Sequence, residues 1–285
     1  MQGFINVFKP SGMSSAKVVA KIKHCFKLDK VGHMGTLDPL ACGILPIAIG
    51  KATRMFDYFL DKTKTYITVF KFGSTSNTLD LDGNIESNIG SVPTKEEILK
   101  ILPSFLGTIS QMPPQFSAKV VNGQKAYKLA RNGEVVNLQP KNITIYDFKL
   151  IEKVDSDSFK FEITCSSGTY IRSLVRDVSN KLKTVGMLTY LERTKSGAFS
   201  KENSVLLDDL LNSNIQNYII DYLTVFPNFK VINVNINNFN RLKNGLTVTQ
   251  ESEDNNNTFV LNNGEVLGVG VISNKQLKLK TYLLD

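Results

Sequence analysis

The side chain with the clearest potential for chemistry is Asp38, a lone carboxylate inside a glycine-rich stretch, residues 32–43. The three glycines of this stretch permit backbone conformations that other residues resist. Pro39 moves Asp38 out of the right-handed helical region, which predicts a bend at the carboxylate. An acid on a shaped loop suits an enzyme. Asp-Pro is also a good N-cap and first turn for a short helix, and these residues alone favour that interpretation.

Arg172 and Tyr66 are two further candidates. Residues 159–165 alternate as a strand and break at a Ser-Ser-Gly turn, after which Thr169 is predicted to cap a helix. Arg172 then lies in the first helical turn, where the helix dipole disfavours a cation, so we expect an anionic partner for it. Tyr66 lies in an alternating strand, where an aromatic residue is usually a core or cross-strand residue.

Composition and charge restrict the class of protein. The chain has 285 residues, of which 42% are hydrophobic and 21% charged, as in ordinary globular proteins. Its net charge is +8, and residues 1–201 hold 28 basic and 17 acidic residues, whereas residues 202–285 hold 6 and 9. A polyanionic partner such as RNA would therefore contact the first two-thirds of the chain.

Several other classes of site and location are disfavoured. The stretch from Gly43 to Arg54 lacks the spacing of a phosphate-binding P-loop, so no nucleotide cofactor is expected. Two histidines and three scattered cysteines give no zinc spacing and no disulfide framework. No signal peptide and no run of ~20 apolar residues is visible. We expect a cytoplasmic protein with reduced thiols, no metal and no membrane segment.

The remaining pattern places elements around these residues. An apolar run after Gly43 predicts a buried strand, Ser14 or Ser15 can cap a helix, and Thr94 opens another with a capping box. Residues 141–154 and 188–199 predict strands. Basic residues interleaved with Tyr127 suit RNA or a solvated surface; they are Lys119, Lys125, Lys128 and Arg131. From about Val231, short strands with Asn-Gly turns predict a small β module.

The motifs, taken in order, resemble the bacterial TruB-type tRNA pseudouridine synthases, which act on the uridine at tRNA position 55. They cover most of residues 3–200 and are individually weak, but the ordered set is specific. The matching stretches are Lys9–Ser15, Gly32–Gly43, Lys64–Tyr66, Pro113–Ala118, Ala126–Arg131, Gly168–Leu174 and Leu191–Thr194.

The resemblance implies an α+β fold: a mixed, largely antiparallel sheet flanked by helices, residues 1–229, and a small C-terminal β-rich PUA-like RNA-binding module, residues 230–285. It also implies binding of the T-stem-loop of tRNA with base flipping, and a monomer is the default expectation. Isomerisation adds and removes nothing, so no cofactor is needed.

The resemblance also assigns site residues. It replaces the purely structural interpretations of Asp38 as a helix cap and of Tyr66 as a core residue. Asp38 becomes the catalytic aspartate, with Tyr66 packed against the target base and Arg172 paired with the aspartate. The predicted substrate-binding residues are His33, Tyr66, Tyr170, Leu191, Lys9 and Pro10.

Some positions depart from the family pattern, and some alternatives stay open. Lys119 precedes Val120 where the order is usually reversed, Glu192 replaces a common basic residue, and Ser179 replaces a frequent glycine. A synthase of this fold with another RNA target, a non-catalytic tRNA-binding or folding protein, and a glycosidase-like hydrolase are the alternatives. A hydrolase needs a second carboxylate, and none lies near Asp38 in the motif.

Overall fold

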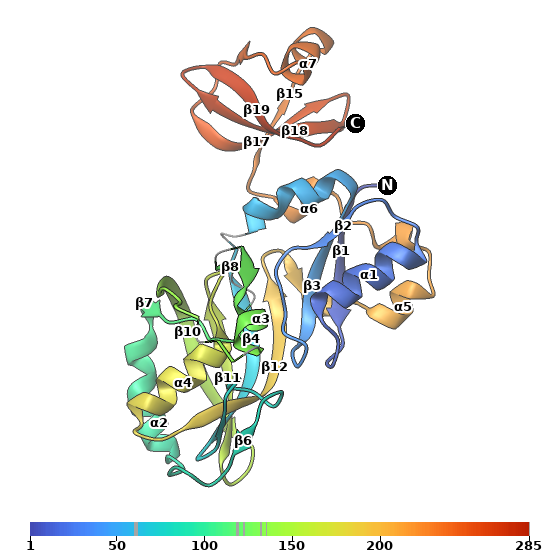
Figure 1. The fold of residues 1–285 in the computed structure, drawn as a ribbon. Helices are drawn as coiled ribbons and strands as arrows, with labels where there is room; N and C mark the ends of the chain where they lie inside the picture. The colour runs from blue at the N-terminus through green and yellow to red at the C-terminus, as the bar shows by residue number, and fades with distance from the viewer. Residues whose placement is uncertain (60–61, 118–119, 122, 132, 135, 285) are drawn as a thin grey trace.

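The computed structural model describes residues 1–285 except 60–61, 118–119, 122, 132, 135 and 285. Its main feature is a ten-stranded sheet that runs through both halves of the larger body (Figure 1). Along its main path the strands are β14 (Val205–Leu206), β1 (Gly3–Lys9), β3 (Cys42–Ile49), β12 (Gly186–Ser196), β4 (Lys64–Phe72), β11 (Ser158–Cys165), β10 (Lys141–Lys153) and β7 (Gly107–Gln111).

The direction of the strands confirms the predicted mixed, largely antiparallel sheet. β1 pairs with β14 in parallel and β12 pairs with β3 in parallel, whereas the other described pairings of this sheet are antiparallel. Two short strands join at the side: β2 (Val31–His33) on β3, and β13 (Phe199–Ser200) on β12. Two small hairpins lie apart from it: β5 (Thr75–Ser76) with β6 (Ile85–Glu86), and β8 (Val120–Val121) with β9 (Gln124–Lys125).

Helices flank the sheet, and two of the three predicted caps are confirmed. Ser14 caps α1 and Thr94 opens α2 with a full capping box. Thr169 is not a cap: α4 begins one residue later with Tyr170 as its N-cap, because the Thr169 hydroxyl donates to the Ser166 carbonyl instead. The helices are α1 (Ser15–Cys25), η1 (Gly50–Phe59), α2 (Lys95–Ile101), η2 (Leu102–Phe105), α3 (Ala126–Arg131), α4 (Ile171–Lys181), η3 (Lys201–Asn203), α5 (Leu207–Leu211), η4 (Ile215–Tyr218), α6 (Tyr222–Val225) and α7 (Ile236–Lys243).

The C-terminal part is a second, five-stranded sheet, as the turn pattern predicts. Its strand order is β15 (Lys230–Asn233), β17 (Asn255–Asn262), β18 (Glu265–Ser273), β19 (Gln276–Tyr282) and β16 (Val248–Thr249). Asn263 and Gly264, both at positive φ, form the two-residue turn between β17 and β18. Helix α7 was not predicted, because its asparagines are poor helix formers.

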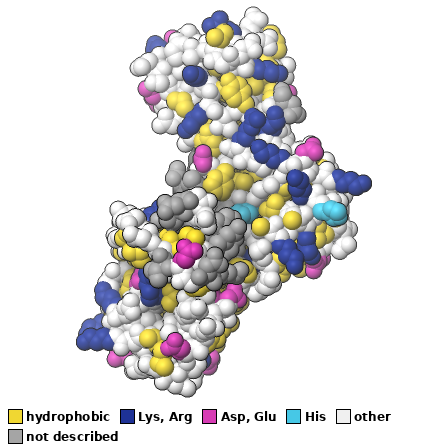
Figure 2. All heavy atoms as spheres, viewed as in Figure 1, with side chains coloured by type: hydrophobic (Ala, Val, Ile, Leu, Met, Phe, Trp, Pro, Cys, Tyr) yellow, Lys and Arg dark blue, Asp and Glu magenta, His cyan; other side chains and the backbone are white. Residues whose placement is uncertain are grey.

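An aromatic cluster joins this part to the larger body. The Phe229 and Phe259 ring centroids lie 5.0 Å apart, and Phe59 lies 5.1 Å from Phe226. In addition, η1 contacts β19, where the Arg54 guanidinium donates to the Tyr282 carbonyl at 2.8 Å. Figure 1 shows the C-terminal sheet above η1, and Figure 2 shows Lys and Arg side chains on this face from the C-terminal part down toward α1. The division at residues 229 and 230 therefore falls beside a shared aromatic core.

Candidate active site

The loop that carries Asp38 lies between β2 and β3, and no helix begins there. The interpretation of Asp-Pro as a helix start is therefore wrong. The reason is that neighbouring segments already bind the loop backbone. The Ser15 hydroxyl donates to the Leu37 carbonyl and accepts from the Leu37 N–H, both at 2.9 Å, and the Gly12 N–H donates to the Pro39 carbonyl at 2.8 Å.

Two buried cations donate hydrogen bonds to backbone carbonyls of this loop. The Arg193 guanidinium donates to the carbonyls of Gly35 at 3.1 Å and Ile44 at 2.8 Å. The Lys9 ammonium donates to carbonyls of its own turn and of Pro39 at 3.3 Å. Burial lowers the pKa of Lys9 to about 8. Charge-assisted bonds of this kind are stronger than neutral ones, so they fix the backbone on both sides of the aspartate.

A glycine makes the approach of Arg193 possible. Gly43 has φ +103°, and a Cβ at this position would collide with the Arg193 backbone. A side chain at residue 43 would push β3 and β12 apart where they pair in parallel. The packing of β3 against β12 therefore requires glycine at this position, next to the Asp38 loop.

Arg172 forms ion pairs with two carboxylates. Its Nη2 lies 2.8 Å from Oδ2 of Asp38, and its Nη1 lies 3.2 Å from Oδ2 of Asp80. The guanidinium also donates to the carbonyls of Thr78 at 3.2 Å and Phe116 at 3.0 Å. Two carboxylates, Asp38 and Asp80, thus serve as the anionic partner expected for a cation in the first turn of α4.

Asp38 and Asp80 differ in accessibility. The Asp80 side chain is 3% exposed and accepts from the Asp82 N–H and the Thr78 hydroxyl, whereas 37% of the Asp38 side chain is accessible. Desolvation by the surrounding protein raises the pKa of the Asp38 carboxyl, and the Arg172 guanidinium partly opposes that rise. Asp38 is therefore the carboxylate available to a substrate, and Asp80 orients the arginine.

Asp38 and Arg172 lie between two cavities. One, of about 310 Å³, is also lined by Tyr66, Tyr170 and Leu191. Its volume is at the lower end of the ~300–1,000 Å³ found for small-ligand pockets. The other, of about 540 Å³, is lined by residues of α1 and of the 77–84 segment, and by His33.

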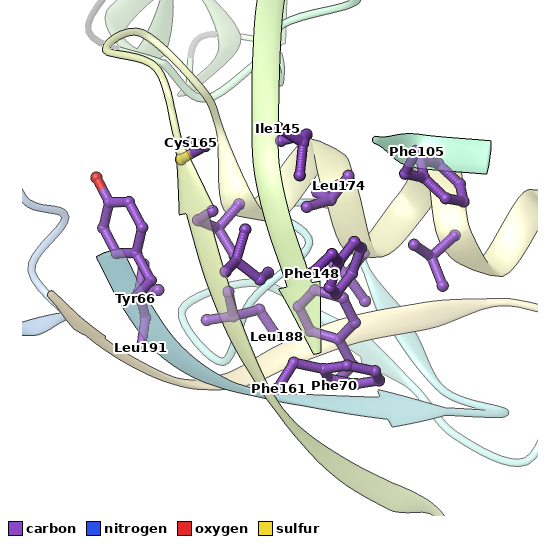
Figure 3. Packing of buried hydrophobic residues seen from close by; sticks show 14 of the residues in the cluster. Tyr66, Phe70, Phe105, Ile145, Phe148, Phe161, Cys165, Leu174, Leu188 and Leu191 are labelled. Atoms are coloured by element: carbon purple, nitrogen blue, oxygen red, sulfur yellow. The ribbon is translucent and has the colours of Figure 1, made fainter. Parts of the chain in front are cut away.

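Tyr66 forms a wall of the smaller cavity. Figure 3 shows Tyr66 and Leu191 at one end of the hydrophobic core, with the tyrosine hydroxyl pointing away from the packed phenylalanines. Burial raises the pKa of Tyr66, and the nearby Arg193 guanidinium partly opposes that rise. Burial likewise raises the pKa of Tyr170, so both phenols stay neutral near pH 7.

The structure brings together most of the predicted site residues, with two exceptions. Lys9 and Pro10 line neither cavity, and the buried Lys9 ammonium instead supports the Asp38 loop. Sequence reasoning missed roles for Asp80 and Arg193. Asp80 lies outside the stretches that match the family, and Arg193 lies in one of them, Leu191–Thr194, without a role assigned to it.

The departures from the family pattern have local explanations. Glu192 forms an ion pair with Lys201 at 2.6 Å and accepts from the Tyr190 hydroxyl at 2.7 Å. It lies between Leu191 and Arg193 on β12, so it points to the face opposite the cavity. The Ser179 hydroxyl occupies the space that a Cβ on Gly186 would take.

The basic stretch around Tyr127, which suits RNA or a solvated surface, falls on side chains outside the described part of the chain. Residues 118–119 lie outside the described residues, and so do the side chains of Val120, Lys125, Tyr127, Lys128 and Arg131. Within the described residues, no three His, Cys, Asp or Glu side chains are grouped so as to hold a metal ion. No helix in the same part of the chain is long and apolar enough to span a membrane.

Comparison with known proteins adds independent information. A model of the TruB family pseudouridylate synthase N-terminal domain matches residues 23–171. The chain is 39% identical over 293 residues to a tRNA pseudouridine synthase B of Clostridium perfringens, covering 100% of both chains. The chain belongs to the TruB family of pseudouridine synthases. It is also 40% identical over 300 residues to the same enzyme of Clostridium novyi, again over 100% of both.

A solved structure supports the fold of this TruB-family chain. An H/ACA ribonucleoprotein bound to a substrate RNA containing 2′-deoxyuridine has a chain with a TM-score of 0.75 and 20% identity. The match covers 99% of this chain and 85% of the other. At this identity the likeness shows a shared fold, and it extends over the C-terminal sheet as well as the larger body.

Proposed function

We propose that this protein converts uridine to pseudouridine at position 55 in the T-loop of tRNA. The observation that carries the proposal is the accessible Asp38 carboxylate, paired with Arg172 at 2.8 Å and placed at a cavity walled by Tyr66 and Leu191. Membership of the TruB family and its relatives' name, tRNA pseudouridine synthase B, support the same substrate.

The reaction is an isomerisation that requires one carboxylate and a confined base. The bond between N1 and C1′ of uridine breaks, the uracil turns, and C5 bonds to C1′; C5 then loses its proton and N1 gains one. Asp38 must be ionised, whether it attacks the sugar or removes the C2′ proton. Arg172 favours the ionised form, and Tyr66 and Leu191 confine the detached uracil against the core.

Access to the cavity requires the uridine to leave its stack. Everting a base costs a few kcal/mol, which contacts with the protein must offset. His33 lines the larger cavity beside Asp38, where it would position the everted nucleotides. Tyr170 closes the smaller cavity from the start of α4. Lys9 acts by holding the Asp38 loop, and Pro10 acts through Lys9, whose ammonium donates to the Pro10 carbonyl.

The remaining parts of the proposal concern the whole protein. Residues 1–229 act as the catalytic domain and residues 230–285 as an RNA-binding module. The enzyme works as a monomer in the cytoplasm, without a nucleotide cofactor.

A single assay separates this proposal from a hydrolase and from a non-catalytic tRNA-binding protein. An unmodified tRNA transcript carrying tritium at uridine C5 is incubated with the protein, and released tritium and free uracil are measured. A synthase releases tritium into water and no uracil, because C5 loses its proton while the base is retained. Free uracil would indicate a hydrolase, and neither product despite tRNA binding would indicate a binding protein.

A further inference from the structure

Phe56 is an aromatic side chain at the cavity that the proposed chemistry does not use. It lies on η1 and lines the smaller cavity together with Asp38 and Tyr66. All 17 phenylalanines lie within the described residues, and the Phe56 side chain is the most exposed of them, at 40%. An exposed phenylalanine is common on protein surfaces, but its position at a reactive cavity calls for an explanation.

The register of η1 explains why this ring points outward. Ala52, Met55 and Phe59 are the buried residues of η1, and they pack into the aromatic cluster that joins the two parts of the chain. Phe56 belongs to none of the described hydrophobic clusters. The packing of η1 is therefore complete without it, and the ring adds open apolar surface at the cavity.

The surroundings of the cavity suit an unpaired nucleotide. The turn at residues 167–169 lines the same cavity, and the Lys141 ammonium lies against Gly168. Arg193 and Lys64 also contribute to the lining, but their side chains are buried and their charged groups bind backbone carbonyls, so Lys141 is the exposed cation beside this cavity. An aromatic face next to cations is how proteins bind single-stranded nucleic acid, with bases stacked on the ring and cations near the phosphates.

We propose that Phe56 stacks on the nucleobase adjacent to the target uridine. This inference rests on the proposed function. The target base must reach Asp38 and is enclosed by Tyr66 and Leu191, which are nearly buried, so the exposed Phe56 ring is left for a neighbour. Eversion of the uridine removes a stacking partner from both adjacent bases, and Phe56 replaces one of these partners.

The test is a double-mutant cycle between the protein and the RNA. Wild type and Phe56→Ala are assayed for pseudouridine formation on the T-stem-loop, and on two variants that are abasic at one or the other neighbour of the target. Phe56→Ala is expected to raise KM roughly tenfold, ~1.4 kcal/mol, with kcat retained. With the correct neighbour abasic, the same substitution should have no further effect.

Two protein controls make the cycle specific. Phe56→Tyr keeps an aromatic face and should retain a near-wild-type KM. Tyr146→Ala, on β10, removes a more exposed ring, at 55%, away from both cavities, and should leave KM unchanged. Thermal unfolding should be the same for Phe56→Ala and wild type.

The outcomes distinguish the two proposals. If wild type forms no pseudouridine on the intact stem-loop, the proposed function fails. If wild type forms product and Phe56→Ala has the same KM, or if its effect is additive with both abasic changes, the stacking inference is overturned.

Discussion

Replacing Arg172 by methionine should separate the stability of the site from its chemistry. The Arg172 and Asp80 side chains are 8% and 3% exposed, so the substitution leaves Asp80 as a buried carboxylate without its cation. Breaking a buried pair in this way costs about 3–5 kcal/mol. Asp80 keeps its bonds from the Asp82 N–H and the Thr78 hydroxyl, which favours the lower end, ~3 kcal/mol.

A second substitution isolates that cost. In the double variant Arg172→Met with Asp80→Asn, the buried charge is removed and most of the lost free energy of unfolding should return. Turnover should not return, because Asp38 still lacks the guanidinium that favours its ionised form. The free energies come from urea unfolding, and turnover comes from single-turnover kinetics with saturating enzyme.

Binding provides the remaining comparison. Filter binding of the T-stem-loop should be nearly unchanged in both variants, because Arg172 is directed at the two carboxylates. Equal losses of binding and turnover in the folded double variant would refute the pairing role. A double variant no more stable than Arg172→Met would refute the assignment of the cost to Asp80.

Three further predictions follow from the same geometry. Asp38→Asn should abolish turnover and raise Tm at neutral pH. The pKa of Asp38 is higher in the folded than in the unfolded state, so the ionised carboxylate destabilises the fold above the folded-state pKa. Calorimetry should therefore show that the gain in Tm disappears as the pH falls. The single-turnover rate should fall in acid as Asp38 becomes protonated. In Arg172→Lys, whose ammonium cannot pair bidentately, this fall should occur at higher pH, as measured by quenched time courses at a series of pH values. Gly186→Ala should lower Tm because its Cβ meets the Ser179 hydroxyl, and adding Ser179→Gly should restore it; a Tm unchanged in the single variant would contradict the packing.

Local sequence signals predicted only some of the features that depend on one segment. The Asp-Pro pair predicted a bend at Asp38, but the same residues favoured a helix start that the structure does not have. The cation in the first turn of α4 correctly indicated an anionic partner. The family resemblance then selected Asp38 as that partner. These features depend on backbone preference and the helix dipole, which act over a few residues.

Asp80 and Arg193 could not be found in the same way. Arg193 reaches the Asp38 loop because β12 pairs in parallel with β3. This register joins segments far apart in the sequence, so no local pattern predicts it. Asp80 reaches Arg172 from the segment after β4, and its own surroundings resemble an ordinary turn. The same limit applies to Thr169, whose hydroxyl donates to the Ser166 carbonyl of the preceding turn, while α4 begins after Tyr170.

The most direct test of the account is to map pseudouridine in an unmodified tRNA transcript after incubation with wild type or Asp38→Asn. Carbodiimide labelling and primer extension report each modified position as a stop. The account predicts a single stop reporting position 55 of the T-loop with wild type and none with Asp38→Asn. A stop that persists with Asp38→Asn would contradict the role given to this carboxylate, and a wild-type stop only elsewhere would contradict the proposed substrate position.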